Sequence, residues 1–578
     1  MSADKISIIF PKPGREGYRK LPEYTLHDLG LDAIVKLLSK KEMEQNLILN
    51  VMTQITADPA VACYRQEVFD DIYRNKAMRD ELMEILEKID FLRDYGAIGK
   101  NHHDTASAWE LMHRLEEIND YIKCVEAITE CLSKADIHSE GLLRLRDYTQ
   151  AIYGDRGFAE LKADIARLKA TTSDLKSVTL GINLNDRYEA ASIGLVSINN
   201  KPFKQSGIIG NFSDFISKGD NISDTTDWNE DYKYHEFSLN SELHTKSLER
   251  VAMQNFVMQN ALAMVTMASV PARDSTEEVP MYMDRITNHM LSLTVKKLRE
   301  VLNKYVTITI TDMTDLIPEF IYYIRWAEYY EQLQAAGAAL CKPRVMLEGD
   351  DWDMHARGIY NLKLVATDGQ DRGQVVVNDL DFDQEHLVYI LTGANRGGKT
   401  TITQAIGQLF VLAQGGVYVP GDSFEYMPVD SIYTHFPADE DKTLDLGRLG
   451  EECKRFKELY SDATSQSLLL LNETFSTTSF EEGYYIAFDS VKAILNKGVR
   501  TIYNTHMHKL AFDIDDMNAC GYRGRAQSLV VRSEADGKRC YKVEVTSPVG
   551  KSFASDIARK YGVTYDLLTG GQSDNENN

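Results

Sequence analysis

The chain has 578 residues, of which 43% are hydrophobic and 26% are charged, and its formal net charge is −23 at pH 7. This length exceeds what one hydrophobic core normally supports, so we expect several domains. The composition is that of an ordinary soluble protein. The acidic excess argues against a broad basic surface that would hold nucleic acid by charge alone, so any contact with DNA would be enclosed or made by few residues.

The sequence contains no apolar stretch long enough to span a bilayer. Its N-terminus lacks the basic start and long apolar core of a signal peptide. The seven cysteines form no C-x-x-C pair, and we interpret them as buried thiols in a reducing compartment. We therefore expect a cytoplasmic protein without membrane contact.

Helical periodicity dominates the first part of the chain. Apolar residues recur at helical spacing from Val68 to Ile89 and from Phe158 to Leu168, and such stripes usually pack in a core. Two stretches, 177–184 and 192–198, instead alternate between apolar and polar residues, which predicts strands of a small sheet.

The middle of the chain returns to helical spacing. Leu291 to Tyr305 carries one apolar stripe, and the segment from Asp315 to Leu333, with Pro318 near its start, predicts a further helix. The acidic stretch 218–236 fits no calcium-binding loop, and we interpret it as a solvated loop. The composition changes near residue 345.

The sequence from Leu391 to Thr401 contains a phosphate-binding motif, because from Gly393 it fits G-x-x-x-x-G-K-[ST]. An apolar run before it predicts a strand, and apolar residues at helical spacing after Lys399 predict a helix. This arrangement gathers backbone N–H groups and a helix N-terminus around a phosphate, whereas the alternative is a glycine turn that only closes a strand–helix unit.

We predict that this loop binds ATP, with Lys399 reaching the β and γ oxygens and Thr400 binding Mg²⁺. The expected ATP-binding residues are Gly393, Ala394, Asn395, Arg396, Gly397, Gly398, Lys399, Thr400 and Thr401.

Two later apolar runs end in polar side chains. The earlier of these runs ends in Asn472 and Glu473. In P-loop ATPases a strand of this kind lies beside the strand that precedes the P-loop, and it supplies one group to the Mg²⁺ shell and one to the attacking water. Glu473 is therefore the candidate catalytic carboxylate, and Asn472 stands where an aspartate ligand is expected. The second run ends in His506, a second catalytic candidate, although a lone histidine is often structural.

In this order the motifs resemble the ATPase domain of the MutS family of DNA mismatch repair and recombination proteins. The resemblance covers residues from about 375 to 560, and Asp58 to Asp71 resembles the start of that family's helical core. The segments that carry it best are Val377–Asp379, Leu412–Pro420, Thr478–Gly483, Thr505–Leu510 and Gly550–Ile557.

The resemblance implies a multidomain protein. An all-α core and lever domain with a small β clamp-like insertion precedes an α/β P-loop ATPase domain of the ABC type. The expected boundaries are 1–172 for the helical core, 173–242 for the insertion, 243–345 for the returning lever helices, 346–570 for the ATPase domain and 571–578 for a polar tail.

Departures from the family pattern matter as well. The sequence starts near the core domain without the Phe-x-Glu wedge, so we expect a short paralogue without the mismatch-reading and connector domains, and without nuclease activity. Asn472 offers a neutral amide oxygen, which binds a hard cation more weakly than a carboxylate does, so we expect slow turnover. Gln414 stands where related transport-type ATPases place a metal-sensing glutamine, and it is equally explained as a helix cap.

The signature loop that caps the partner's γ-phosphate in the family is altered here. Gly447, Arg448 and Gly450 remain as its candidate residues, with Arg448 either a finger acting in trans or a surface arginine. If the loop acts across subunits, a homodimer joined through the ATPase domains completes the site.

Three functions stay open at this point. The first is an ATP- and Mg²⁺-dependent DNA-binding clamp in DNA repair or recombination. The second is a weakly hydrolysing ATP-binding switch or scaffold that recruits proteins, which the altered residues favour. The third, a small-molecule kinase, rests on the P-loop alone and lacks substrate-lid features.

Overall fold

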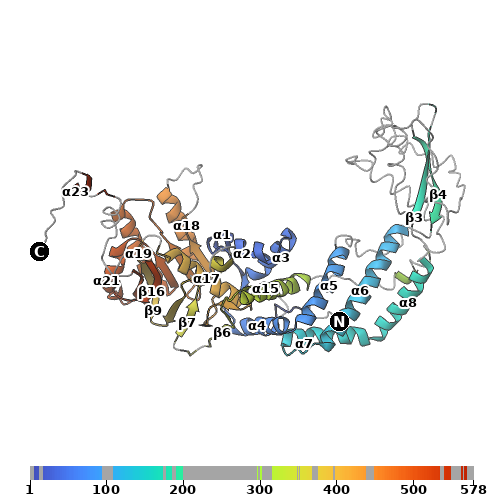
Figure 1. Cartoon of the computed structure of the whole chain (residues 1–578), viewed down its shortest axis with the longest axis horizontal. Coiled ribbons are helices and arrows are strands. Elements are labelled where there is room, and N and C mark those ends of the chain that lie inside the picture. The colour runs from blue at the N-terminus through green and yellow to red at the C-terminus, as the bar shows by residue number, and fades with distance from the viewer. Residues whose placement is uncertain are drawn as a thin grey trace, which may run out of the picture. The chain divides into compact units, whose positions relative to one another are not determined.

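The computed structural model of the chain divides into two compact units (Figure 1). The first unit comprises residues 1–86, 131–147 and 315–578, and the second comprises 87–130 and 148–314. The described residues are 6–11, 17–93, 108–172, 177–184, 186, 190–199, 296, 300–302, 316–347, 349–350, 352–366, 375–394, 397–437, 448–533, 539–548, 562–563 and 565–568. The expected loop 218–236, most of the lever 243–345, the segment Gly550–Ile557 and the tail 571–578 lie outside them.

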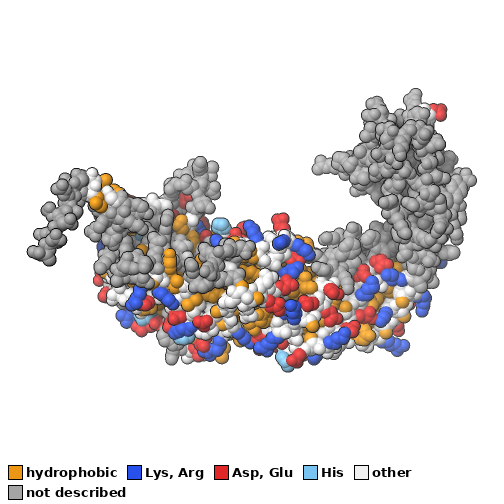
Figure 2. Space-filling model, in the orientation of Figure 1, with side chains coloured by type: hydrophobic (Ala, Val, Ile, Leu, Met, Phe, Trp, Pro, Cys, Tyr) orange, Lys and Arg blue, Asp and Glu red, His pale blue; other side chains and the backbone are white. Residues whose placement is uncertain are grey.

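The second unit is built from helices and one hairpin, and α5 (Lys76–Arg93), α6 (Ala108–Lys134) and α7 (Glu140–Gly154) each extend into it from the first unit. Ion pairs join Lys162 to Glu126 and Lys169 to Glu116, so α8 (Arg156–Thr172) runs antiparallel to α6. The two predicted strands are confirmed as an antiparallel pair, β3 (Ser177–Leu184) and β4 (Ala190–Asn199). On the face drawn in Figure 2, the described helices carry basic and acidic side chains interspersed.

The predicted helical run from Val68 to Ile89 is two helices, because the chain breaks at Asn75. Asp58 accepts a hydrogen bond from the backbone N–H of Ala60 and begins α4 (Pro59–Arg74). The Asn75 side chain donates to the backbone oxygens of Asp71 and Asp136, both at 2.8 Å. Asparagine forms such local bonds in competition with the helix, which explains why periodicity alone missed the break.

The predicted helix from Asp315 to Leu333 is confirmed as α15 (Ile317–Ala335). Its buried face is largely aromatic, and Tyr322, Tyr323, Trp326 and Tyr330 are fully buried. α15 packs mainly against α3 and α4. The other helices on the N-terminal side are α1 (Glu23–Asp28), α2 (Leu31–Leu38) and α3 (Glu42–Met52), with the short strand pair β1 (Arg19–Lys20) and β2 (Gln54–Ile55).

A six-stranded sheet with the order β12-β13-β14-β9-β15-β16 forms the centre of the C-terminal part. All neighbours in it are parallel except β15 and β16. Its strands are β9 (His386–Thr392), β12 (Ile432–His435), β13 (Leu468–Asn472), β14 (Arg500–Asn504), β15 (Arg525–Ser533) and β16 (Arg539–Val545). The expectation that the carboxylate strand lies beside the P-loop strand is wrong, because β14 stands between β13 and β9.

Helices cover both faces of this sheet, which explains why Leu468 to Leu471 is apolar without alternation. Leu469 and Leu471 belong to the buried cluster under α19 (Phe480–Lys497). Leu470 points to the other face, where it meets Gly407 of α17 (Lys399–Gln414) closely. The remaining helices are α16 (Leu362–Ala366), α18 (Arg448–Asp462), α20 (His508–Phe512), α21 (Ile514–Asn518) and α23 (Tyr565–Leu568).

A four-stranded sheet with the order β6-β11-β7-β8 contacts the six-stranded sheet through β8. Its strands are β6 (Arg344–Val345), β7 (Trp352–Ile359), β8 (Asn378–Asp383) and β11 (Ser423–Tyr426), and a separate pair joins β5 (Leu340–Cys341) to β10 (Val419–Pro420).

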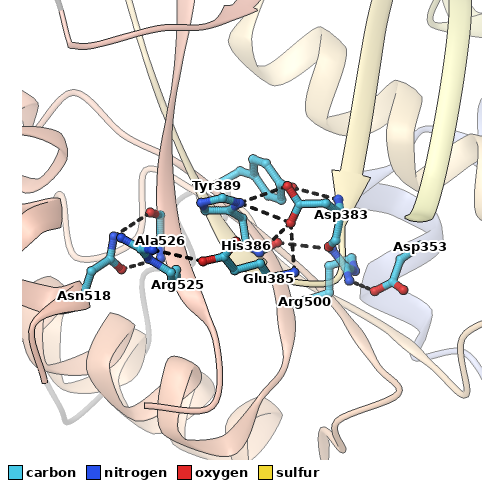
Figure 3. A network of polar contacts seen from close by, with 9 residues as sticks. All are labelled: Asp353, Asp383, Glu385, His386, Tyr389, Arg500, Asn518, Arg525 and Ala526. Carbon is cyan, nitrogen blue, oxygen red and sulfur yellow. Dashed lines mark hydrogen bonds and ion pairs between the residues drawn. The ribbon is translucent and has the colours of Figure 1, made fainter. Parts of the chain in front are cut away.

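Arg500 ties the two sheets together at the amino end of β14 (Figure 3). Its guanidinium donates to the backbone oxygens of Asp383 and His386, at 3.1 and 3.3 Å, and forms an ion pair with Asp353 of β7. The Asp383 carboxylate accepts the backbone N–H groups of Glu385 and His386 and so closes the turn between β8 and β9. This end of the sheet is fixed by a closed network of polar contacts.

The seven thiols are free, but the expectation that they are buried is only partly right. Cys124 and Cys131 are buried, whereas Cys520 is exposed and the others are half-buried. Among the helices that the structure describes, none combines the length and apolarity needed to cross a membrane.

Candidate functional site

The candidate site residues meet at the carboxyl ends of three parallel strands. Asn472 of β13 is the register partner of Asn504 in β14, and Asn504 is the partner of Leu391 in β9. The loops that follow these strands therefore leave the sheet at one edge. Although the strand order differs from the predicted one, the predicted convergence of the P-loop, Glu473 and His506 is present.

Two glycines of the P-loop occupy positions that a side chain would not tolerate. Gly393 has φ 144°, and a Cβ there would lie 2.8 Å from the Cβ of Val531. Gly398 has φ 93° and forms the N-cap of α17. Both conformations favour glycine, which explains the spacing of the motif physically. Asn395 and Arg396 lie outside the described residues.

Lys399 is almost fully buried, with 5% of its surface exposed. Its Nζ donates to the backbone oxygens of Gly393 and Ala394, at 3.1 and 3.4 Å, and lies 3.4 Å from Nδ1 of His506. Burial lowers the pKa of Lys399, and the nearby Glu473 carboxylate partly offsets this. Among the described residues this buried cation bonds only loop carbonyls and a ring nitrogen, so it is well placed to bind an anion.

Glu473 stands at a strained point directly after β13. Its backbone φ is 54°, in the left-handed region that non-glycine residues rarely adopt. Its N–H donates to the Asn504 carbonyl at 2.9 Å, and its carboxylate Oε1 lies 2.8 Å from Nε2 of His506. The turn thus aims the carboxylate at the histidine and the P-loop, and strain of this kind clusters at functional sites.

Thr400 and Asn472 offer oxygen atoms that suit Mg²⁺. The Thr400 hydroxyl donates to Oδ1 of Asn472 at 3.1 Å. The Asn504 side chain donates to that same Oδ1. Hydroxyl and amide oxygens are hard donors of the type that Mg²⁺ accepts, so the residues present fit the ion.

The prediction that Gln414 is a metal ligand is wrong. Gln414 ends α17, and at about 1.5 Å of rise per residue it lies roughly 20 Å along the helix from Thr400. Its amide nitrogen donates to the backbone oxygens of Thr56 and Val429, and its amide oxygen accepts the Val429 N–H at 3.2 Å. The side chain therefore connects the C-terminal end of α17 to the segments that contain Thr56 and Val429. This structural role resembles the alternative explanation of Gln414 as a helix cap.

A cavity of about 690 Å³ lies over the P-loop. Its lining includes Gly397 to Thr401 together with Glu473 and His506. Apolar and aromatic residues also line it, namely Tyr360, Leu364, Val375, Val376 and Tyr541. The sequence reasoning missed all five of these residues, because they come from separate segments and carry no spacing signal.

Tyr541 closes the cavity from β16. Its φ is 55°, and its Cδ1 would lie 3.3 Å from a Cβ on Gly398. Asn378 of β8 holds this segment in place, since its amide donates to the Tyr541 carbonyl at 3.2 Å and accepts the Val543 N–H at 2.8 Å. Asn378 therefore lines the cavity and also holds the strand that carries Tyr541.

The segment after Glu473 is connected to the helix that follows the signature loop. The Thr477 hydroxyl donates to Oε2 of Glu452, at 2.8 Å, and Glu452 lies on the early part of α18. Gly450, in the first turn of α18, is exposed. Gly447 lies outside the described residues, and for Arg448 only the backbone is described.

The sheet order, the glycine turn before α17 and the carboxylate after β13 define a P-loop nucleotide-binding domain. Residues 389–572 match the family model "MutS domain V", and residues 57–209 match the model "MutS2 N-terminal domain". The chain therefore belongs to the MutS family.

Similar curated proteins carry the same family names. A segment of 142 residues is 34% identical to the DNA mismatch repair protein MutS of Haloquadratum walsbyi, covering 24% of this chain and 15% of that protein. A segment of 194 residues is 28% identical to endonuclease MutS2 of Thermus thermophilus, covering 33% of this chain and 25% of that protein. The chain thus spans a quarter or less of the length of these relatives.

Proposed function

We propose that this chain is an ATP-dependent DNA-binding clamp of the MutS type that acts in DNA repair or recombination without wedge-type mismatch reading. The observation that carries the proposal is the meeting of Lys399, Thr400 and Glu473 in one cavity at the carboxyl edge of the sheet. The name of the similar MutS protein, a DNA mismatch repair protein, supports the assignment to DNA repair. A cytoplasmic location and slow turnover without nuclease activity belong to the same proposal.

The proposed division of labour follows the geometry. The P-loop N–H groups and Lys399 bind the β and γ phosphoryl groups, and Thr400 and Asn472 hold Mg²⁺. The bound Mg²⁺ neutralises charge that develops on the phosphoryl oxygens. Glu473 orients the attacking water, and His506, 2.8 Å from it, holds the carboxylate in place. Tyr360 and Tyr541 supply aromatic rings in the cavity lining against which a purine ring can pack.

The exposed Gly450 and the connection between Thr477 and Glu452 support an ATP-joined homodimer. In this arrangement the start of α18 from one subunit closes the site of the other. The contact from Thr477 to Glu452 then transmits a change at the Glu473 turn to that closing helix.

One observation favours the alternative of an ATP-binding switch or scaffold that recruits proteins. Asn472 is neutral and already accepts two hydrogen bonds, from Thr400 and Asn504. A neutral ligand binds Mg²⁺ weakly, which favours binding over turnover. Under this alternative, DNA leaves both affinity and rate unchanged.

The test measures ATP binding and turnover with no DNA and with duplex, mismatched and four-way-junction DNA at stated salt. The clamp proposal expects Mg²⁺-dependent binding and a turnover rate that at least one DNA form changes. Tight binding with negligible turnover and no DNA effect selects the switch. Failure of the wild-type protein to bind any adenine nucleotide with Mg²⁺ rejects both.

The variant Glu473→Gln sharpens this test. It preserves the shape of the side chain and removes the charge that orients water, so we expect turnover to fall by roughly 100-fold or more with nucleotide affinity kept. Light scattering should then find the ATP-bound protein as a dimer. Glu481→Gln, which changes an exposed glutamate at the start of α19, is the matched control and should behave as wild type.

A further inference from the structure

Asn504 is a buried amide with an unusual set of contacts. It ends β14, is fully buried, and lies directly across from Asn472 in the neighbouring strand. Its Nδ2 donates to Oδ1 of Asn472. Among the residues that the structure describes, no donor reaches its own Oδ1. An acceptor buried without a partner costs free energy, and this one lies beside the candidate Mg²⁺ ligand Asn472.

The contact matters because the side chain of Asn472 has two different ends. An amide carries one oxygen and one NH₂ group of nearly equal size, and a half-turn about its last bond exchanges them. Only the oxygen can bind a cation. An aspartate has no such ambiguity, because both ends of its carboxylate are oxygens. A site that uses asparagine in place of aspartate therefore needs a neighbour that selects the orientation.

Asn504 is placed to make that selection. Oδ1 of Asn472 accepts both the Asn504 amide and the Thr400 hydroxyl, which lies 3.1 Å away. While Asn504 presents its NH₂ group to Asn472, the reversed orientation of Asn472 would set two NH₂ groups against each other and would present nitrogen to Thr400. We propose that Asn504 is a positioning residue that holds the amide oxygen of Asn472 toward the Mg²⁺ side of the site. This inference rests on the proposed ATP and Mg²⁺ site.

The test is a double-mutant cycle at positions 472 and 504, in which nucleotide binding is measured as a function of Mg²⁺ concentration. A fluorescent ADP analogue is bound to the protein, and MgCl₂ is titrated to find the concentration that gives half of the Mg²⁺-dependent increase in affinity. Asn504→Leu replaces the amide by an apolar side chain of similar size. We expect this concentration to rise by roughly fivefold to tenfold, the worth of one lost hydrogen bond. In the Asn472→Asp background the same change should shift it by less than about twofold, because a carboxylate needs no orientation.

Stability separates positioning from a merely structural role. Asn504→Leu also removes the acceptor without a partner, so the nucleotide-free thermal midpoint should stay level or rise. Asn504→Ala is measured in parallel and should show the same dependence on the residue at position 472, even if its cavity lowers the midpoint. Asn518→Leu is the matched control, since Asn518 bonds the backbone of Ala526 away from the site, and it should leave the Mg²⁺ requirement unchanged.

Two results overturn the inference while leaving the proposed function intact. One is wild-type Mg²⁺ dependence in Asn504→Leu and Asn504→Ala, and the other is an equal rise in both backgrounds, which would mean that Asn504 acts independently of Asn472. Wild-type protein that shows no Mg²⁺-dependent binding of the analogue overturns the proposed function as well.

Discussion

Buried polar groups at the two ends of the six-stranded sheet differ in how completely they are hydrogen-bonded. At the amino end, Nη1 of Arg500 bonds the backbone oxygens of Asp383 and His386, and Nη2 pairs with Asp353 (Figure 3). At the carboxyl end, the described residues offer Lys399 two loop carbonyls and a ring nitrogen as its hydrogen-bonding partners, and they offer none to Oδ1 of Asn504. Arg500, Lys399 and Asn504 are all buried, so the exposure of these three side chains does not explain the difference.

At these two ends, the comparison suggests that the paired network at Arg500 holds the fold, whereas the groups at Lys399 and Asn504 are available to a ligand. In a closed network each donor and acceptor already has a partner, so none is available to a ligand. Breaking such a network leaves charged or polar groups without their partners. An incomplete network costs stability in the isolated chain, and a bound ligand recovers that cost. Substitutions at the amino end should therefore change stability without changing binding, and those at the carboxyl end should do the reverse.

The largest expected effect is at the amino end. Arg500→Ala leaves two backbone oxygens and the partly exposed Asp353 without their donor, so we expect the free energy of unfolding to fall by about 2–4 kcal/mol, since each buried acceptor left unpaired costs about 1–3 kcal/mol. Urea denaturation followed by circular dichroism measures this change. Nucleotide affinity, measured below the unfolding transition, should stay within about twofold of wild type.

Arg525→Ala is the matched control at the same end. Arg525 pairs with Glu385, but both side chains are more than half exposed. Exposed pairs contribute about 0–1 kcal/mol, so this variant should be nearly neutral. A loss for Arg525→Ala equal to that for Arg500→Ala, or a large change in nucleotide affinity in Arg500→Ala, would contradict the division between the two ends.

The next effect is at the carboxyl end. Lys399→Ala removes the buried cation from the cavity, and we expect ADP and ATP affinity to fall by roughly 100-fold, a charge-assisted contact being worth about 1.5–3 kcal/mol. Isothermal titration calorimetry measures the affinities. Stability should change little or increase, because burial already disfavours the charged lysine. Lys509→Ala removes an exposed charge near the site and should bind as wild type; equal weakening in both variants would indicate a general charge effect.

The same contrast explains what the sequence could predict. The P-loop was predictable because Gly393 to Lys399 is one local segment in which each glycine answers a backbone requirement. Glu473 and His506 were predictable because polar residues that end apolar runs collect at one edge of a parallel sheet. The order of the strands was not, since nothing in the sequence of β14 states that it enters between β9 and β13.

The remainder of the site depends on distant pairings. Tyr541 reaches the cavity from the last strand of the sheet, and Asn378 positions it from another sheet. Neither pairing leaves a local pattern. The error over Gln414 has a different origin, because helix geometry alone places it at the far end of α17 from Thr400. The resemblance to related ATPases suggested a metal-binding role for Gln414, and the length of α17 excludes that role.

The smallest effect tests the carboxyl end from the opposite direction. Asn472→Asp adds a carboxylate that is almost fully buried, beside the donors Thr400 and Asn504. Without Mg²⁺ the new charge should leave stability unchanged or lower it by about 1 kcal/mol, because two hydrogen bonds only partly replace its hydration. With Mg²⁺ and ADP the charged ligand should lower the half-saturating Mg²⁺ concentration by about tenfold and raise ATP turnover. The sign of the stability change should therefore reverse when Mg²⁺ and nucleotide are added, as thermal unfolding with and without EDTA would measure. An unchanged Mg²⁺ requirement would mean that the ion is held by other groups, and the carboxyl end would then be incomplete for a reason other than metal binding.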